Sequence, residues 1–115
     1  MTGEAKIAIV TGGGRGIGQA ISCRLAQTGC FVWVNYVSRP EAAQETVKLI
    51  EDQGGKGRIV QFDVADFNQV QAAFKEILAE SGSLDILVNN AGITRDGLVA
   101  RMKESDWDRV VDTNL

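Results

Sequence analysis

A glycine-rich loop near the N-terminus constrains the fold of this chain more than any other feature. The loop, Thr11-Gly-Gly-Gly-Arg-Gly-Ile-Gly18, lies between an apolar run over residues 6–11 and a helical pattern over residues 16–28. Because glycine has no Cβ, such a loop turns sharply and lets the helix approach the strand closely. The helix N-terminus then offers unpaired N–H groups and a partial positive charge to a phosphate. We therefore predict a strand, a phosphate-binding loop and a helix.

The spacing of the glycines separates this loop from two other phosphate-binding loops. A Walker A loop needs Lys and then Ser or Thr after its last glycine, whereas Gly18 is followed by Gln19 and Ala20. The GxGxxG pattern fails in every register. A glycine-rich turn without a ligand is the alternative, which the agreement of strand, loop and helix disfavours. The candidate binding residues are Gly12, Gly13, Gly14, Arg15, Gly16, Ile17 and Gly18.

The remaining sequence alternates short apolar runs with helical patterns. Further strands are predicted over residues 31–35, 58–62 and 84–89, and further helices over residues 40–53, over residues 66–82 and from about residue 104 onward. The strands show no clean alternation of apolar and polar residues, which indicates a parallel sheet covered by helices on both faces. We predict a doubly wound α/β fold with the strand order 3-2-1-4.

Apolar spacing and capping residues predict how the helices pack and begin. The expected inner faces are Ile17, Ala20, Ile21 and Leu25 in the first helix, Ala43, Val47 and Ile50 in the second, and Val70, Ala73, Phe74 and Ile77 in the third. Asp66 and Gln69 form an expected capping pair. Before the second helix, Ser38 fits a capping box, whereas Pro40 at the first helical position would make Arg39 the cap.

Composition excludes several classes of function. The 115-residue chain is long enough for one domain, and its 12 basic residues are scattered under a net charge of −3, so nucleic acid is not an expected partner. There is no histidine, and Cys23 and Cys30 are too few and wrongly spaced for a metal site. We find no signal peptide and no stretch of membrane-spanning length, so we expect a cytoplasmic protein that does not bind a membrane.

The order Thr11-Gly12-xxx-Gly16-x-Gly18 resembles the TGxxxGxG motif of short-chain dehydrogenases/reductases. Two other segments match the same family. Asp63-Val64 follows the third strand, where family members bind the adenine end of their cofactor, and residues 89–92 read Asn-Asn-Ala-Gly, the NNAG motif. A plain turn is the alternative for this second segment. The resemblance implies an NADP-binding Rossmann half-domain over residues 1–115, with cofactor-binding positions at Asp63, Val64, Asn90, Ala91 and Gly92.

The residues after the second strand favour NADP(H) over NAD. NAD-binding enzymes usually place an acidic side chain there, where it accepts hydrogen bonds from the ribose hydroxyls. Residues 35–39 read Asn-Tyr-Val-Ser-Arg, and the first acid is Glu41. Arg15 and Arg39 are suited to a 2′-phosphate through charge-assisted hydrogen bonds. The candidates here are Asn35, Ser38 and Arg39; as alternatives, Arg39 is a solvated side chain and Ser38 only a helix cap.

The C-terminal segment carries a narrower resemblance. Gly92-Ile-Thr-Arg-Asp-Gly97, Arg101-Met102, Trp107 and Asp112-Thr-Asn-Leu115 resemble 3-oxoacyl-[acyl-carrier-protein] reductases, and acetoacetyl-CoA reductases share much of this segment. The resemblance implies NADPH-dependent reduction of a 3-oxoacyl thioester on acyl carrier protein or CoA by a homo-oligomer, a tetramer in the family. It also implies that Asn114 is the catalytic asparagine, which orders a water in the proton relay. A buried structural asparagine is the alternative.

The resemblance covers about the first half of a family member. The family's tyrosine acid is followed four positions later by lysine, whereas Tyr36, the one tyrosine here, is followed by Pro40, and Ser105 is misplaced for the family's serine. We expect a chain truncated inside its last helix and inactive by itself. We also expect an open edge on the fourth strand, with either self-association or a disordered C-terminal turn. A dinucleotide-binding module without catalysis is the alternative function.

Overall fold

The computed structural model describes residues 5–90 and 98–102. Its elements are β1 (Ile7–Val10), α1 (Gly16–Gln27), β2 (Phe31–Tyr36), α2 (Glu41–Asp52), β3 (Lys56–Gln61), α3 (Phe67–Ser81), β4 (Leu84–Asn89) and β5 (Leu98–Met102). The helix predicted from residue 104, together with Ala91, Gly92 and Asn114, lies outside the described residues.

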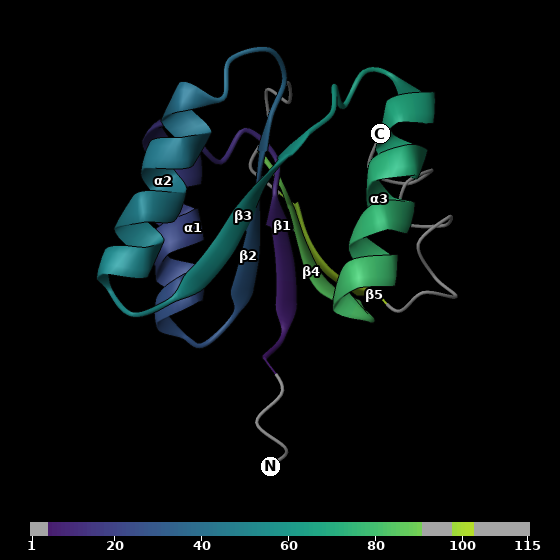
Figure 1. The fold of residues 1–115 in the computed structure, drawn as a ribbon. Helices are drawn as coiled ribbons and strands as arrows, with labels where there is room; N and C mark the ends of the chain where they lie inside the picture. The colour runs from purple at the N-terminus through teal and green to yellow at the C-terminus, as the bar shows by residue number, and fades with distance from the viewer. Residues whose placement is uncertain (1–4, 91–97, 103–115) are drawn as a thin grey trace.

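One sheet forms the centre of the molecule, with the strand order β3-β2-β1-β4-β5. β1 pairs in parallel with β2 and β4, and β2 pairs in parallel with β3, which confirms the predicted order 3-2-1-4. The helices α1 and α2 cover one face and α3 covers the other (Figure 1). Because parallel strands end at the same edge, the segments that follow β1 to β4 meet at one end of the sheet.

The expected open edge on the fourth strand is wrong in this structure. β5 pairs antiparallel with β4, with Leu98 opposite Asn89 and Ala100 opposite Leu87. An unpaired strand edge presents a row of N–H and C=O groups that any extended segment can join. Leu98-Val-Ala-Arg-Met102 follows β4 closely enough in the sequence to do so.

The two faces of the sheet bury different side chains. The α3 face holds Trp33, Phe62 and Phe74 and confirms the predicted inner residues of α3, with Leu78 added. The α2 prediction is also confirmed, since Ala43 and Ile50 are buried and Val47 is partly buried against the same cluster. The α1–α2 cluster consists mostly of alanine and valine: Ala8, Val10, Ala26, Cys30, Val32, Val34, Ala43, Ile50 and Val88.

The predicted inner face of α1 is wrong by about one position. Gly18, Ser22 and Ala26 are the buried residues of this helix, whereas Ile17 is 72% exposed. Ala20 is also exposed, and Ile21 and Leu25 are only partly buried. The apolar pattern located the bulky residues, but the helix packs through its smallest ones. Small side chains allow the backbone of α1 to come closer to the loop before it.

The predicted N-cap of α3 is confirmed, whereas both predicted N-caps of α2 are wrong. Asp66 caps α3, because its Oδ1 accepts the backbone N–H of Gln69 at 3.1 Å. Neither Ser38 nor Arg39 caps α2: the N-cap is Pro40, without a side-chain hydrogen bond. Pro40 has helix-like dihedral angles (φ −78°, ψ −12°), and its carbonyl accepts the N–H of Gln44 at 2.8 Å. The helical geometry therefore begins after both proposed caps.

Candidate functional site

The glycine loop is packed too tightly for a side chain at three of its positions. A Cβ at Gly13 would lie 2.9 Å from the Ser22 hydroxyl oxygen and 3.0 Å from the carbonyl oxygen of Val10. A Cβ at Gly18 would collide with the carbonyl oxygen of Gly12, so the first turn of α1 lies directly against the start of the loop. A Cβ at Gly14 would lie 2.9 Å from the backbone nitrogen of Ala43, which belongs to α2. The loop is thus enclosed between α1 and α2, and only glycine permits this approach.

Hydrogen bonds with Val88 of β4 and with Asn90, just after β4, support the N-terminal end of the loop. The backbone N–H of Asn90 donates to the Thr11 hydroxyl oxygen at 2.7 Å, and the Thr11 hydroxyl lies 3.3 Å from the carbonyl oxygen of Val88. The Asn90 side chain donates to the carbonyl oxygen of Gly12 at 3.4 Å. Asn90 therefore lies beside the glycine loop, and its backbone and side-chain N–H groups hold the start of the loop.

A buried threonine on α2 supports the middle of the loop. Thr46 is fully buried, and its hydroxyl lies 3.3 Å from the carbonyl oxygen of Gly14 and 3.0 Å from that of Ala42. The same hydroxyl accepts a hydrogen bond from the Gln19 side chain at 3.0 Å. Sequence reasoning missed this link, although a polar residue within the apolar stripe of α2 was a signal, because a buried hydroxyl needs partners.

Asn35 supports the loop from the end of β2. Its side chain is 1% exposed, and its Oδ1 accepts the backbone N–H of Gly12 at 3.2 Å. Its Nδ2 donates to the carbonyl oxygen of Phe62 at 2.9 Å, with those of Tyr36 and Val60 at 3.2 and 3.4 Å. The N–H donors of this amide are therefore engaged by the protein itself.

An open cavity of about 250 Å³ lies where the glycine loop, the end of β2 and the start of α2 meet. It brings together six of the predicted cofactor-binding residues. Gly12, Gly14, Arg15, Asn35, Ser38 and Arg39 line it, together with Tyr36, Val37, Ala42 and Ala43. The last four were not predicted, because their place in the wall depends on how α2 packs against the loop. Of the remaining predicted residues, Gly13, Gly16, Ile17, Gly18 and Asn90 belong to the loop region but do not line this cavity.

The cavity wall carries positive charge only. Arg15 and Arg39 are both exposed, and within the described residues neither guanidinium has a carboxylate within 4.0 Å. No described lining residue bears a carboxylate. Two guanidinium groups beside a glycine loop form an environment that favours an anion, and a phosphate above all.

Asp63 and Val64 lie outside this cavity. The Asp63 carboxylate accepts the backbone N–H of Ala65 at 2.9 Å, while the Asp63 N–H donates to the Gln69 side chain at 3.0 Å. Val64 packs partly against the α3-side cluster. The segment is therefore fixed to the start of α3, at the end of the sheet that also carries the glycine loop.

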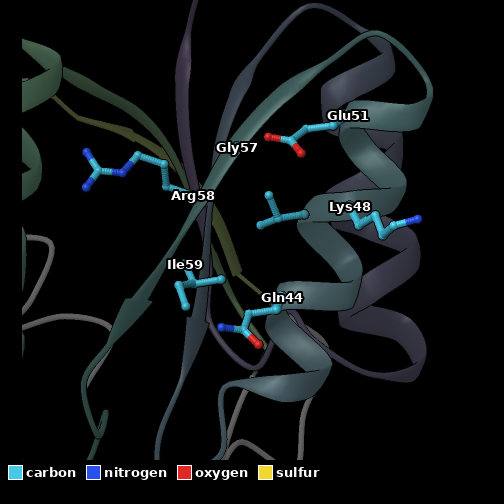
Figure 2. A pocket seen from close by; sticks show the side chains of 7 residues that line it. Gln44, Lys48, Glu51, Gly57, Arg58 and Ile59 are labelled. Carbon is cyan, nitrogen blue, oxygen red and sulfur yellow. The ribbon is translucent and has the colours of Figure 1, made fainter.

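A larger hollow of about 350 Å³ lies between α2 and β3, away from the glycine loop (Figure 2). Lys48, Glu51 and Arg58 line it, so its charges are mixed, and Arg58 points away from α2. The Arg58 guanidinium lies 5.0 Å from the centre of the Trp33 ring and pairs with Glu80. These contacts engage Arg58 within the protein, and the Lys48 ammonium lies 3.9 Å from the Asp52 carboxylate, so both cations of the hollow have a carboxylate partner, unlike Arg15 and Arg39.

Among the described residues, no helix combines the length and the apolar character needed to cross a bilayer. The same part of the chain contains no group of three His, Cys, Asp or Glu side chains placed to hold a metal ion.

Comparison with known proteins identifies relatives of this chain. The family model described as short chain dehydrogenase matches residues 6–115. The 3-oxoacyl-[acyl-carrier-protein] reductase FabG of Staphylococcus aureus is 51% identical over 110 residues, which cover 96% of this chain and 45% of the relative. The 3-oxoacyl-[acyl-carrier-protein] reductase of Synechocystis is 47% identical over 111 residues. The chain thus spans about half the length of the curated relatives it matches.

Solved structures agree with these relatives. A short chain dehydrogenase from Burkholderia cenocepacia in complex with NADP is 48% identical with a TM-score of 0.71, over 78% of this chain and 37% of that one. An actinorhodin polyketide ketoreductase variant with NADPH is 32% identical with a TM-score of 0.72, over 80% and 35% of the two chains. By its sequence and its fold, this chain belongs to the short-chain dehydrogenase family.

Proposed function

We propose that this chain binds NADP(H) and forms the cofactor-binding half of a reductase that acts on 3-oxoacyl thioesters. The observation that carries the first part is the cavity where Arg15 and Arg39 flank the glycine loop without a carboxylate among the described lining residues. NADP differs from NAD by a 2′-phosphate, which an acidic side chain would repel and a guanidinium attracts.

The residues present fit this cofactor. The close approach between Gly18 and Gly12 brings the N-terminus of α1 against the loop, and its backbone N–H groups suit the pyrophosphate. Arg15, Ser38 and Arg39 would hold the 2′-phosphate, while Asp63 and Val64 would hold the adenine end. When bound, the cofactor supplies a hydride to a carbonyl. The family membership and the NADP-bound relatives support this assignment.

The activity of the whole protein is a further part of the proposal. Relatives with 51% and 47% sequence identity to this chain are named 3-oxoacyl-[acyl-carrier-protein] reductases. Their names support the proposal that the whole protein reduces a 3-oxoacyl group carried by acyl carrier protein. A CoA thioester is the alternative substrate. We assign Asn114 to the catalytic position that orders a water. We place the protein in the cytoplasm as a homo-oligomer, with Asn90, Ala91 and Gly92 beside the cofactor.

Titration of the chain with NADPH and NADH by calorimetry tests the cofactor assignment. We expect tighter binding of NADPH, and we expect Arg15→Ala to weaken NADPH binding roughly tenfold, since hydrogen bonds to charged groups are worth about 1.5–3 kcal/mol and exposure favours the lower limit. Arg39→Ala should act in the same direction, and NADH binding should change little in both. Arg24→Ala is the matched control, because Arg24 is an exposed arginine in the last turn of α1, the helix whose N-cap is Arg15.

Two results would count against the proposal. Equal affinities for NADPH and NADH in the unaltered chain would contradict the assignment of the cavity to the 2′-phosphate. In the same samples, oxidation of NADPH by acetoacetyl-CoA should be absent, because the 115-residue sequence holds no tyrosine followed four positions later by lysine. Measurable turnover would show that the catalytic residues have been assigned wrongly.

A further inference from the structure

We infer that Asn35 is a positioning residue for the dinucleotide. Its side chain fixes the glycine loop and the end of β3 relative to each other. This inference rests on the proposed function, because the two segments matter together only if one ligand spans them. The geometry of the amide, however, can be tested without any ligand.

The position of Asn35 allows it to connect strands that are not neighbours. β2 lies between β1 and β3 in the sheet. From the end of β2, the Asn35 amide reaches the N–H of Gly12, which follows β1, at 3.2 Å. It also reaches the carbonyl oxygen of Phe62, which follows β3, at 2.9 Å. Gly12 begins the proposed pyrophosphate loop, and Phe62 directly precedes the proposed adenine segment at Asp63.

The surroundings of the amide require both of its functional groups. Its oxygen faces an N–H group at Gly12, and its nitrogen faces the carbonyl oxygens of Tyr36, Val60 and Phe62. The reverse orientation would place oxygen against three oxygens, so the hydrogen-bond partners settle which atom is which. At 1% exposure no solvent replaces a lost partner, and an unpaired buried group is costly. A neutral side chain with one acceptor and one donor is therefore needed here.

A substitution that can gain or lose one proton tests this requirement. In Asn35→Asp, the protonated carboxyl keeps both an acceptor for Gly12 and a donor for Phe62. The ionised carboxylate is acceptor-only and faces the three carbonyl oxygens. Burial and these carbonyls disfavour the ionised form, so protonation should be accessible at mildly acid pH. Arg15 and Arg39 are the charged groups among the described residues that line the adjacent cavity.

We expect the ratio of the NADPH Kd of Asn35→Asp to that of the unaltered chain to depend on pH. The ratio should be about ten or more near pH 8, because a hydrogen bond is lost and a buried group is unsatisfied. It should fall to within about threefold near pH 5.5 as the introduced carboxyl becomes protonated. Comparison with the unaltered chain at each pH removes the titration of the 2′-phosphate itself.

A destabilising substitution away from the site serves as the control. Ile77→Ala shortens a buried side chain of α3 in the other core cluster, in the half of the helix that is farther from the Asp63–Val64 segment. Its Kd ratio should stay near one at every pH. A ratio for Asn35→Asp that is large and independent of pH would show a general structural defect and overturn the inference.

The hydrogen bond between Gly12 and Asn35 can also be measured in the unaltered, ligand-free chain. This measurement keeps the inference testable even if Asn35→Asp fails to fold at high pH. A hydrogen bond from Gly12 to Asn35 should give a through-bond NMR coupling between the Gly12 amide nitrogen and the Asn35 side-chain carbonyl carbon. It should also slow hydrogen exchange at the Gly12 amide. Fast exchange together with the absence of this coupling would overturn the inference. Failure of the unaltered chain to bind NADPH would instead count against the proposed function and leave this link standing.

Discussion

The two faces of the sheet are stabilised in different ways. On the α3 face, the core contains Trp33, Phe62 and Phe74, and the Phe62 and Phe74 rings meet edge to face with centroids 6.0 Å apart. On the opposite face, α1 packs through Gly18, Ser22 and Ala26. Large buried side chains contribute more hydrophobic free energy than small ones. The buried residues of α3 therefore contribute more hydrophobic free energy than those of α1.

The small buried residues of α1 bury little apolar area, but they let the helix lie close to the glycine loop. Because its residues are small, the helix N-terminus lies against the glycine loop, and hydrogen bonds from Asn35, Thr46 and Asn90 hold the loop in place. The glycine loop, which we propose to bind phosphate, is thus held by backbone contact and hydrogen bonds, while the larger apolar side chains are buried on the opposite face.

The largest expected effect tests the α3 face. Ile77 is fully buried on α3, and Ile77→Ala should lower the free energy of unfolding by about 2–5 kcal/mol through lost apolar contact and a cavity. Urea denaturation followed by circular dichroism measures this loss. The NADPH affinity of the folded variant should remain within about twofold of the unaltered chain. A clear change in that affinity would show that the two faces are not independent.

The second-largest expected effect tests the close packing of α1 against the glycine loop. Gly18→Ala places a Cβ against the Gly12 carbonyl, and we expect a stability loss of about 1–3 kcal/mol with a more than tenfold loss of NADPH affinity. Gly82→Ala is the matched control, since Gly82 ends α3 at a φ of +83° with open space around it. It should cost about 1 kcal/mol of stability without any effect on NADPH. If both variants bind NADPH equally well, the role of close packing at the loop is disproved.

The smallest expected change in stability concerns the N-terminal caps of α2 and α3. Asp66→Ala removes a side-chain cap and should lower stability by about 1 kcal/mol. Ser38→Ala should change stability by less than about 0.5 kcal/mol, because α2 has no side-chain cap. Thermal or urea unfolding of both variants provides the measurement. A loss of stability in Ser38→Ala as large as that in Asp66→Ala would show that Ser38 caps α2, as the capping box in the sequence predicts.

Much of the fold was predictable because local signals agreed. The apolar runs, the helix periods and the turn glycines predict the alternation of strands and helices, from which right-handed crossovers favour the strand order 3-2-1-4. Asp66 and Gln69 predict the start of α3 from the sequence alone. The inner face of α1 was not predictable in this way. Periodicity identifies where bulky residues recur, whereas the distance between helix and loop decided which residues of α1 became buried.

The candidate site shows the same division. The glycine spacing, the lack of an acid after β2 and the family resemblance follow from the sequence alone, because they depend on residue type and order. Only the tertiary structure shows that Arg15 and Arg39 line one cavity. It also shows that Asn35, near the end of β2, forms hydrogen bonds with both Gly12 and Phe62. The physical reason is that these contacts join segments separated by 23 to 27 positions, and their geometry is set by how β1, β2 and β3 align in the sheet.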